Sequence, residues 1–323
     1  MEDIIYKWTK LGRVYNPEIH GHGAWMAQFA QAPCTLKFDN FVRVYFSCRP
    51  LPDAQGQYVS YSAYADLDKR DLFRIINVAS IPILDLGSTG TFDEFGTYPV
   101  SVIRRSGSII AYYGGWTRCE SVPFNVAIGR AVSHDDGKTF IKSGPGPVLS
   151  FDPDEPFILS GPKIRFYNDR YYMWYIAGCK WILDNHRAEP VYRIRLASSD
   201  DGISWEKEHR NLIETKIEDE AQASPDVFFR NGKYHMFFCY RYGTGYRGRE
   251  RGYRIGYAWS YNLTDWERED HRAGLEVSDI GWDSDMVSYP HLYEHEGSIY
   301  MFYLGNGVGR EGFGVARLEG DLF

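Results

Sequence analysis

The chain has 323 residues, 44% of them hydrophobic and 16% aromatic, with a formal net charge of −7. This apolar content is ample for a buried core, and the negative charge argues against general nucleic-acid binding. The sequence has no 18-residue apolar run and no apolar signal core near its first residue, so we expect no membrane segment and a cytoplasmic location. The five cysteines form no CxxC pair. We therefore expect free thiols, buried in a reducing compartment, rather than disulfides.

One unit of sequence recurs five times along the chain. Its clearest copy is Ser224–Arg241, SPDVFFRNGKYHMFFCYR. A proline marks each copy, and successive prolines are 66, 63, 63 and 65 residues apart. From each proline to a closing aromatic residue is 13 or 14 residues. A fixed period with a fixed internal spacing is typical of repeat architectures. The marking prolines are Pro33, Pro99, Pro162, Pro225 and Pro290.

Each unit has the pattern of a four-stranded antiparallel blade. Two short runs rich in aromatic and β-branched residues are joined by a hairpin turn, and a third and a shorter fourth run follow. Five such units predict an all-β fold, a five-bladed β-propeller that occupies residues 1–323 as a single domain. The last copy lacks a fourth run, so we expect the N-terminal run Ile5–Val14 to complete it and close the ring. Two insertions, Trp181–Pro190 and Tyr242–Gly252, leave from the ends of second strands.

Acidic residues recur shortly before the repeated prolines. In a propeller the first strand of each blade lines the central channel, so residues just before it gather on one face around the axis. Glu94, Glu220 and Asp285 each stand five residues ahead of their proline. Carboxylates that face one cavity can protonate a leaving oxygen or activate water. We therefore predict these three residues as catalytic acid or base groups. The same recurrence would also result from a structural device repeated in each blade.

A second set of polar residues follows the second strand of each blade. Guanidinium and ammonium groups at this place can hold a phosphate or a carboxylate. Tyr98 and Tyr289 stand directly before their prolines, where they can stack on a sugar or hydrogen-bond with it. The predicted substrate-binding residues are Arg49, Tyr98, Arg118, Lys180, Arg241, Tyr289 and Asn306.

Two other patterns carry no predicted site. The glycine-rich run Gly305–Gly314 joins two antiparallel strand-like runs and opens no helix, unlike a phosphate-binding loop. His20 and His22 are a pair of possible metal ligands, but no third ligand accompanies them. We therefore expect neither a metal nor another cofactor.

The repeated blade pattern resembles the five-bladed propeller enzymes of glycoside hydrolase families 32, 43, 68 and 130, and the resemblance spans all five blades. At the positions of the family 43 acids this chain has Ala32, Tyr98 and Ser160, so those roles do not carry over. The run VYFSCRP at 44–50 is similar to the arginine-bearing strand of the family 130 mannoside phosphorylases and hydrolases. That similarity implies that Arg49 contacts substrate or phosphate. The fifth copy is similar to uncharacterised propellers assigned to the glycosyl hydrolases.

These patterns together predict a carbohydrate-active enzyme that acts on a glycosidic bond of a small, anionic glycan or activated sugar by hydrolysis, transfer or phosphorolysis. Its expected partner is a small carbohydrate, and the sequence is silent on oligomeric state. Two alternatives stay open, a non-catalytic sugar-binding propeller and a protein-interaction platform. An enzyme would place at least two of the predicted carboxylates in one open pocket. A binding protein would place aromatic and basic groups there without such a pair, and a platform would present a flat apolar patch.

Overall fold

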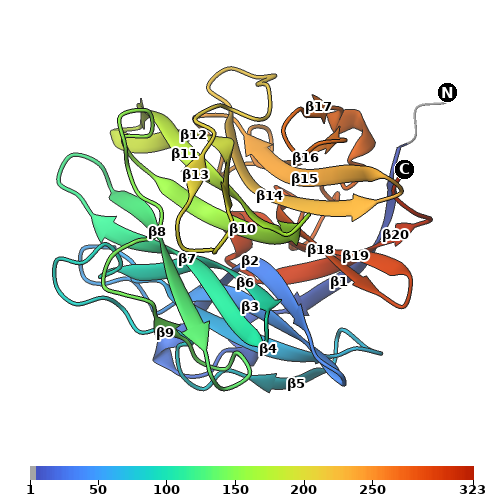
Figure 1. Ribbon diagram of the computed structural model, residues 1–323, viewed down its shortest axis with the longest axis horizontal. Helices are drawn as coiled ribbons and strands as arrows, with labels where there is room; N and C mark the ends of the chain where they lie inside the picture. The colour runs from blue at the N-terminus through green and yellow to red at the C-terminus, as the bar shows by residue number, and fades with distance from the viewer. Residues whose placement is uncertain (1–4) are drawn as a thin grey trace.

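The computed structural model describes residues 5–323. Its strands form five four-stranded antiparallel sheets, which are arranged as blades around a common centre (Figure 1). The predicted five-bladed β-propeller is therefore confirmed. No helix in this described part of the chain is long and apolar enough to cross a membrane.

Blades one to four each take their strands from one repeat, and the strand order within each of these blades follows the chain. Blade one consists of β2 (Gln28–Lys37), β3 (Phe41–Arg49), β4 (Tyr61–Asp68) and β5 (Ile75–Val78). Blade two consists of β6 (Gly96–Arg105), β7 (Ser108–Arg118), β8 (Phe124–Ser133) and β9 (Ile141–Lys142). Blade three consists of β10 (Leu159–Tyr167), β11 (Arg170–Asp184), β12 (Arg187–Ser199) and β13 (Glu206–Lys207).

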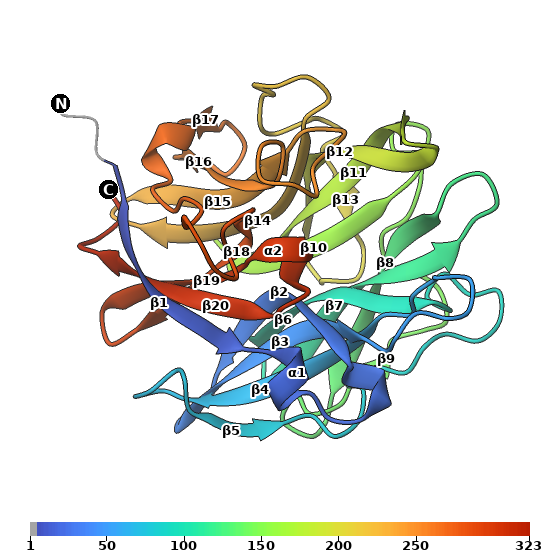
Figure 2. The ribbon, with the colours of Figure 1, turned by 180° about the vertical axis from the view of Figure 1, so that it is seen from behind.

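Blades four and five complete the ring. Blade four consists of β14 (Ala221–Arg230), β15 (Lys233–Arg241), β16 (Arg254–Ser260) and β17 (Glu267–Arg268). Blade five consists of β18 (Ser288–His295), β19 (Ser298–Leu304), β20 (Phe313–Glu319) and β1 (Lys7–Tyr15). The helical segments are short: α1 (Pro17–His20), η1 (Ala24–Met26), η2 (Asp270–Arg272) and α2 (Asn306–Gly309). Figure 2 shows α2 close to the middle of the ring.

The N-terminal strand β1 forms the outer strand of blade five. It pairs antiparallel with β20, with Lys7 opposite Glu319 and Trp8 opposite Leu318. The indole Nε1 of Trp8 donates to the carbonyl oxygen of Ala273, 2.9 Å away. Because the first and last strands share one sheet, the ring is closed by backbone hydrogen bonds. The predicted completion of the last blade is confirmed.

The closing aromatic of each repeat is buried in the core. These side chains are at most 1% exposed, and each belongs to a core cluster that includes residues of the neighbouring blade. Burial of one such ring contributes on the order of 2 kcal/mol to stability. Their constant distance from the proline therefore reflects one packing position that is filled in every blade. The five residues are Phe46, Tyr113, Tyr175, Phe238 and Tyr303.

Every inner strand bends at its repeated proline. The register between first and second strand shifts there in all five blades, for example between Ala223 and Asp226 in blade four. The residue before the proline has a positive φ in four blades, and in blade two the peptide between Tyr98 and Pro99 is cis. Such bulges re-aim side chains at functional sites. The residues with positive φ are Ala32 (52°), Gly161 (61°), Ser224 (49°) and Tyr289 (54°).

All five cysteine thiols are free, as predicted. Cys34, Cys48 and Cys239 are buried, and burial raises the pKa of the Cys239 thiol to about 12. Cys119 and Cys179 are exposed, which corrects the expectation that all five are buried. Both follow the last inward-facing residues of a second strand, where the chain has already left the core.

Candidate functional site

A cavity of about 500 Å³ lies at the axis of the ring. Its walls come from all five blades, because the bends at the prolines bring one or more residues of each inner strand to the same place. The helix α2 also contributes, through Gly307 and Val308. The wall residues supplied by the inner strands include Gln31, Tyr98, Ser160, Gly161, Ser224 and Tyr289.

Arg49, the last residue of β3, points a guanidinium group into a set of aromatic rings. Its guanidinium carbon lies 4.8 Å from the ring centre of Phe29, 5.2 Å from that of Tyr58 and 5.6 Å from that of Tyr98. Its Nε is buried without a hydrogen-bond partner, and no carboxylate among residues 5–323 forms an ion pair with it. Burial lowers the pKa of Arg49. A buried cation without an anion is costly, and a bound anion would relieve that cost.

Arg241 also lines the cavity, but its hydrogen bonds are satisfied within the protein. Its guanidinium donates to the carbonyl oxygens of Pro190 and Tyr242, both 2.9 Å away, and to the hydroxyl of Tyr253, 3.1 Å away. It also lies 3.7 Å from the ring centre of Tyr246. Arg241 therefore holds the tyrosines of the wall in place and leaves little donor capacity for a ligand.

Glu189 is the one carboxylate among the described residues that line the axial cavity. It is 2% exposed and is held from three sides. The Tyr246 hydroxyl donates to its Oε2 at 2.7 Å, and its Oε1 lies 2.8 Å from Arg247 Nη1 and 3.3 Å from Arg187 Nε. These residues come from the two insertions, which contact each other through the Gly245 amide and the Asp184 carboxylate at 2.9 Å.

The cavity is strongly cationic although the chain as a whole is anionic. Five arginines and one glutamate are found among the described lining residues, while the formal net charge of the chain is −7. A cleft lined by charges of one sign concentrates ligands of the opposite sign. Two further wall residues have buried side-chain oxygens without a hydrogen-bond partner, Gln31 and Ser224. The lining arginines are Arg49, Arg187, Arg241, Arg247 and Arg310.

A second hollow of about 590 Å³ adjoins the axial cavity between blades one and two. We call it the side groove. Arg49, Tyr58, Trp116, Phe124 and Arg187 line both spaces, so the two are continuous. The indole of Trp116 and the ring of Phe124 have their centres 4.3 Å apart.

Five of the seven predicted binding residues lie at this joined site. Arg49, Tyr98, Arg241 and Tyr289 line the cavity and Arg118 lines the side groove. The other two lie elsewhere. Lys180 is half-exposed and pairs with Asp219 at 2.5 Å. The Asn306 side chain accepts from the Asp285 amide at 2.7 Å and donates to the Gly281 carbonyl at 3.0 Å.

The three predicted catalytic carboxylates do not line the axial cavity. Glu220 is fully buried, with Oε1 2.7 Å from Arg268 and 2.8 Å from the Gln222 amide. Glu94 accepts from the Gly90 amide at 2.8 Å in a loop ahead of β6. Asp285 lies ahead of β18. A catalytic role for these three carboxylates stays a prediction, and no two of them are brought together at this cavity.

A repeated device accounts for most of the acids ahead of the prolines. In blades two, three and five, the closing tyrosine donates its hydroxyl to a buried acid from the loop before the inner strand. A lysine on the fourth strand pairs with the same acid. We call these sets acid brackets. They are Asp93–Tyr113–Lys142, Glu155–Tyr175–Lys207 and Asp283–Tyr303–Lys10.

Blade four has the same bracket without the tyrosine. Glu220 takes the place of the acid, and Arg268 on β17 takes the place of the fourth-strand lysine, at 2.7 Å. The closing aromatic is Phe238, which has no hydroxyl to donate. The brackets tie the loop before the first strand to the last strand of the same blade, so the recurrence of acids in the sequence has a structural cause.

Polar residues at one or three positions after three of the prolines form a charged cluster at the axis, which the sequence analysis did not predict. His291 Nδ1 lies 3.3 Å from Asp226 Oδ2, and Arg165 pairs with the other oxygen of Asp226. Lys163 Nζ lies 3.5 Å from His291 and 3.5 Å from the carbonyl of Pro33. Burial lowers the pKa of His291 to about 4, so its imidazole is neutral. The cluster links the inner strands of four blades.

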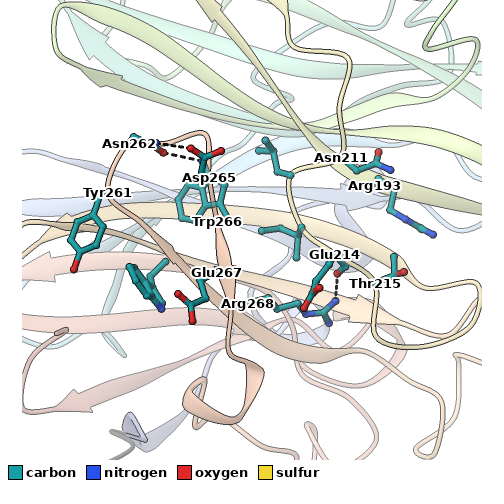
Figure 3. A pocket seen from close by; sticks show the side chains of 13 residues that line it. Arg193, Asn211, Glu214, Thr215, Tyr261, Asn262, Asp265, Trp266, Glu267 and Arg268 are labelled. Atoms are coloured by element: carbon teal, nitrogen blue, oxygen red, sulfur yellow. Dashed lines mark hydrogen bonds between the residues drawn. The ribbon is translucent and has the colours of Figure 1, made fainter. Parts of the chain in front are cut away.

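Two further candidates lie away from the axis. A hollow of about 1050 Å³ lies between blades three and four. Figure 3 shows its side chains, where the Asn262 amide donates to Asp265 and Arg268 donates to the backbone carbonyl of Glu214. Only these two blades line it. The side chains of Asp152, Glu155 and His209 have ligand atoms within 4.8 Å of one another. The Lys207 ammonium lies 2.7 Å from Asp152 and 2.9 Å from Glu155, in the place that a metal ion would take.

Comparison with the sequences of known proteins shows which family the chain belongs to. No protein-family model matches it. It is 35% identical over 315 residues to the uncharacterized protein Rv1502 of Mycobacterium tuberculosis, covering 97% of this chain and 99% of that protein. The chain belongs to the Rv1502 family. Because the match to Rv1502 runs through all five blades, it includes the axial cavity and both insertions.

More distant relatives share the propeller. The β-1,2-mannobiose phosphorylase of a Thermoanaerobacter species is 25% identical over 177 residues, covering 51% of this chain and 54% of that protein. A solved glycoside hydrolase has a TM-score of 0.76 at 15% identity, covering 98% of this chain and 93% of that one. Solved members of glycoside hydrolase families 43, 32 and 130 give TM-scores of 0.62, 0.57 and 0.69. The resemblance of the Rv1502-family chain to these propellers is confirmed at the level of the fold.

Proposed function

We propose that the protein is a carbohydrate-active enzyme that binds an anionic sugar in the axial cavity and moves the glycosyl group between a phosphate and a hydroxyl oxygen. The observation that carries the proposal is Arg49, a half-buried arginine at the cavity wall with a buried Nε, aromatic neighbours and no carboxylate partner among the described residues. Aromatic rings suit the faces of a sugar, and a guanidinium suits a phosphate.

The choice of reaction rests on the number of carboxylates at the cavity. Hydrolysis of a glycosidic bond normally uses a pair of carboxyl groups. Glu189 is the one carboxylate among the described lining residues, and two arginines and a tyrosine hydroxyl already contact it. Glu189 is therefore the one carboxylate of the described cavity wall that can take part in proton transfer, and a single carboxylate suits a reaction that needs one base.

In the proposed step, an acceptor hydroxyl loses its proton to Glu189 and its oxygen attacks the anomeric carbon. A new bond from that carbon to the acceptor oxygen forms, and the bond to the phosphate oxygen breaks. The electron pair leaves with the phosphate, where Arg49 stabilises the charge. The reverse step is phosphorolysis, and the phosphorylase name of the Thermoanaerobacter relative supports a reaction of this class.

A non-catalytic sugar-binding protein is the second candidate. It is favoured by the position of Glu94, Glu220 and Asp285, none of which lines the cavity. A sugar-binding protein would also bind sugar phosphates through Arg49, but it would not turn them over.

The test measures binding and turnover with the same probes. Glucose 1-phosphate and mannose 1-phosphate are titrated by calorimetry into the parent protein, Arg49→Ala and the control Arg74→Ala, whose side chain is 73% exposed. Phosphate release is then followed with a panel of sugar acceptors. We expect binding that Arg49→Ala abolishes and Arg74→Ala leaves intact. Binding that is absent, or that survives Arg49→Ala, would refute the proposal, and binding without turnover would establish the second candidate.

A further inference from the structure

The joined shape of the axial cavity and the side groove restricts where a bound anion can sit. Arg49 and Arg187 line both spaces, so the cationic groups stand at the junction and not at a closed end. A phosphate at this junction has about 500 Å³ on one side and about 590 Å³ on the other. A sugar 1-phosphate needs only one of these spaces. The ligand that fills both has an organic group on each side of its phosphate.

The two spaces differ in what they offer to such groups. The axial side has hydroxyls and amides on its wall, including the unpartnered side-chain oxygens of Gln31 and Ser224. These suit the hydroxyls of a sugar. The partly exposed rings of Trp116 and Phe124 stand at the junction, and the ring of Phe95 continues the aromatic wall into the side groove alone. Flat aromatic rings at a groove wall suit the face of a planar heterocycle.

We propose that the natural ligand is a nucleoside diphosphate sugar, with the sugar in the axial cavity, the diphosphate at Arg49 and Arg187, and the nucleoside in the side groove. This inference rests on the proposed function, and it names the glycosyl donor of that reaction. The electron pair of the broken anomeric bond then leaves with the terminal phosphate, and the second product is a nucleoside diphosphate.

The position of Arg187 adds a reason for this assignment. It stands at the first residue of β12, just past the turn of the long hairpin β11–β12, and it is exposed. Its Nε pairs with Glu189 at 3.3 Å, which leaves donors of the same guanidinium for a second anion. A diphosphate offers two anionic groups, one for Arg49 and one for Arg187.

The test separates the two halves of the ligand. UDP-glucose and GDP-mannose are compared by calorimetry with glucose 1-phosphate and mannose 1-phosphate, and with farnesyl diphosphate as a diphosphate that lacks a planar base. Stacking of a base on an aromatic ring predicts that a nucleotide sugar binds at least about tenfold more tightly than its sugar 1-phosphate. Free UDP or GDP should compete with it.

Two groove variants provide the control. Gln57→Trp and Ser121→Trp each fill the groove from an exposed position that does not line the axial cavity. Both should remove the tenfold gain and leave sugar 1-phosphate binding unchanged, while Ser108→Trp, at an exposed position outside the groove, should change neither.

Equal affinity for nucleotide sugars and sugar 1-phosphates, or a gain that both groove variants preserve, would overturn the inference. The inference would also be overturned if farnesyl diphosphate displaced the bound nucleotide sugar and UDP or GDP did not. Loss of sugar 1-phosphate binding in Arg49→Ala is a separate result, because it tests the proposed function and not the occupant of the groove.

Discussion

The guanidinium of Arg49 lies 5.6 Å from the ring centre of Tyr98, and the two residues come from neighbouring blades and both line the axial cavity. Tyr98 is itself buried, which raises the pKa of its hydroxyl. The pair places a cation beside a neutral aromatic face, with room beyond it for an anion. Such a site binds through charge and holds a sugar through ring contact.

Replacement of Arg49 by methionine should separate stability from binding. Removal of a half-buried cation that lacks an anion has little structural cost, so we expect the free energy of unfolding to stay within about 1 kcal/mol of the parent or to rise. Sugar phosphate binding should be lost in the same variant. Urea denaturation with calorimetry checks both, and a loss of more than about 2 kcal/mol would show that the guanidinium is needed for the fold.

Glu189→Gln should reduce turnover without removing the ligand. The amide keeps the size of the side chain and can still accept hydrogen bonds, but it cannot take the acceptor proton. We expect a fall in turnover of at least about a hundredfold, with the affinity for sugar phosphates changed by less than about threefold. Equal losses in affinity and turnover would instead assign Glu189 to positioning Arg187 and Arg247.

Glu220→Gln distinguishes the acid bracket from the predicted catalytic role. The change removes one of the two carboxylates that pair with the buried Arg268, while Asp270 stays 2.9 Å away, and we expect a loss of about 1–3 kcal/mol in the free energy of unfolding. Glu94→Gln, whose carboxylate caps a loop amide, is the matched control and should cost about 1 kcal/mol or less. If Glu220→Gln were fully stable but inactive, the catalytic prediction would be supported.

Stability should fall on mild acidification because of buried histidines. Burial lowers the pKa of His235 to about 4, from an ordinary value of 6.5. Between these pH values the His235 imidazole is protonated in the unfolded chain and neutral in the folded protein. The free energy of unfolding therefore falls as the pH drops from about 6.5 to about 4. Denaturation at several pH values measures the slope. His235→Asn should show a shallower slope over that window, and an unchanged slope would contradict the assignment.

The ring itself could be predicted from the sequence because its determinants are periodic. One proline and one closing aromatic mark each blade, so the number of blades and the position of each inner strand follow from spacing. The completion of the last blade by β1 followed from a missing fourth run. The predicted Arg49, Tyr98 and Tyr289 reach the cavity for the same reason, since their places are fixed relative to the repeat.

The rest of the site lies in segments that are not part of the repeated unit. Glu189 and Arg247 belong to the two insertions, and nothing in their spacing relates them to the axis, although the insertions themselves were visible. The repeated acids show that a period in the sequence can also come from a structural device. Asp93, Glu155 and Asp283 recur because each blade needs the same internal bracket, so recurrence alone did not separate structure from chemistry.

The bend before each repeated proline also bears on how specificity can change in this family. Four different side chains, alanine, glycine, serine and tyrosine, occupy one backbone geometry at Ala32, Gly161, Ser224 and Tyr289. The scaffold therefore accepts exchange of these side chains while the conformation of the main chain is kept. Altered ligand preference in relatives or in designed variants can begin at these wall positions, by substitution alone, with no insertion or remodelling of the blades.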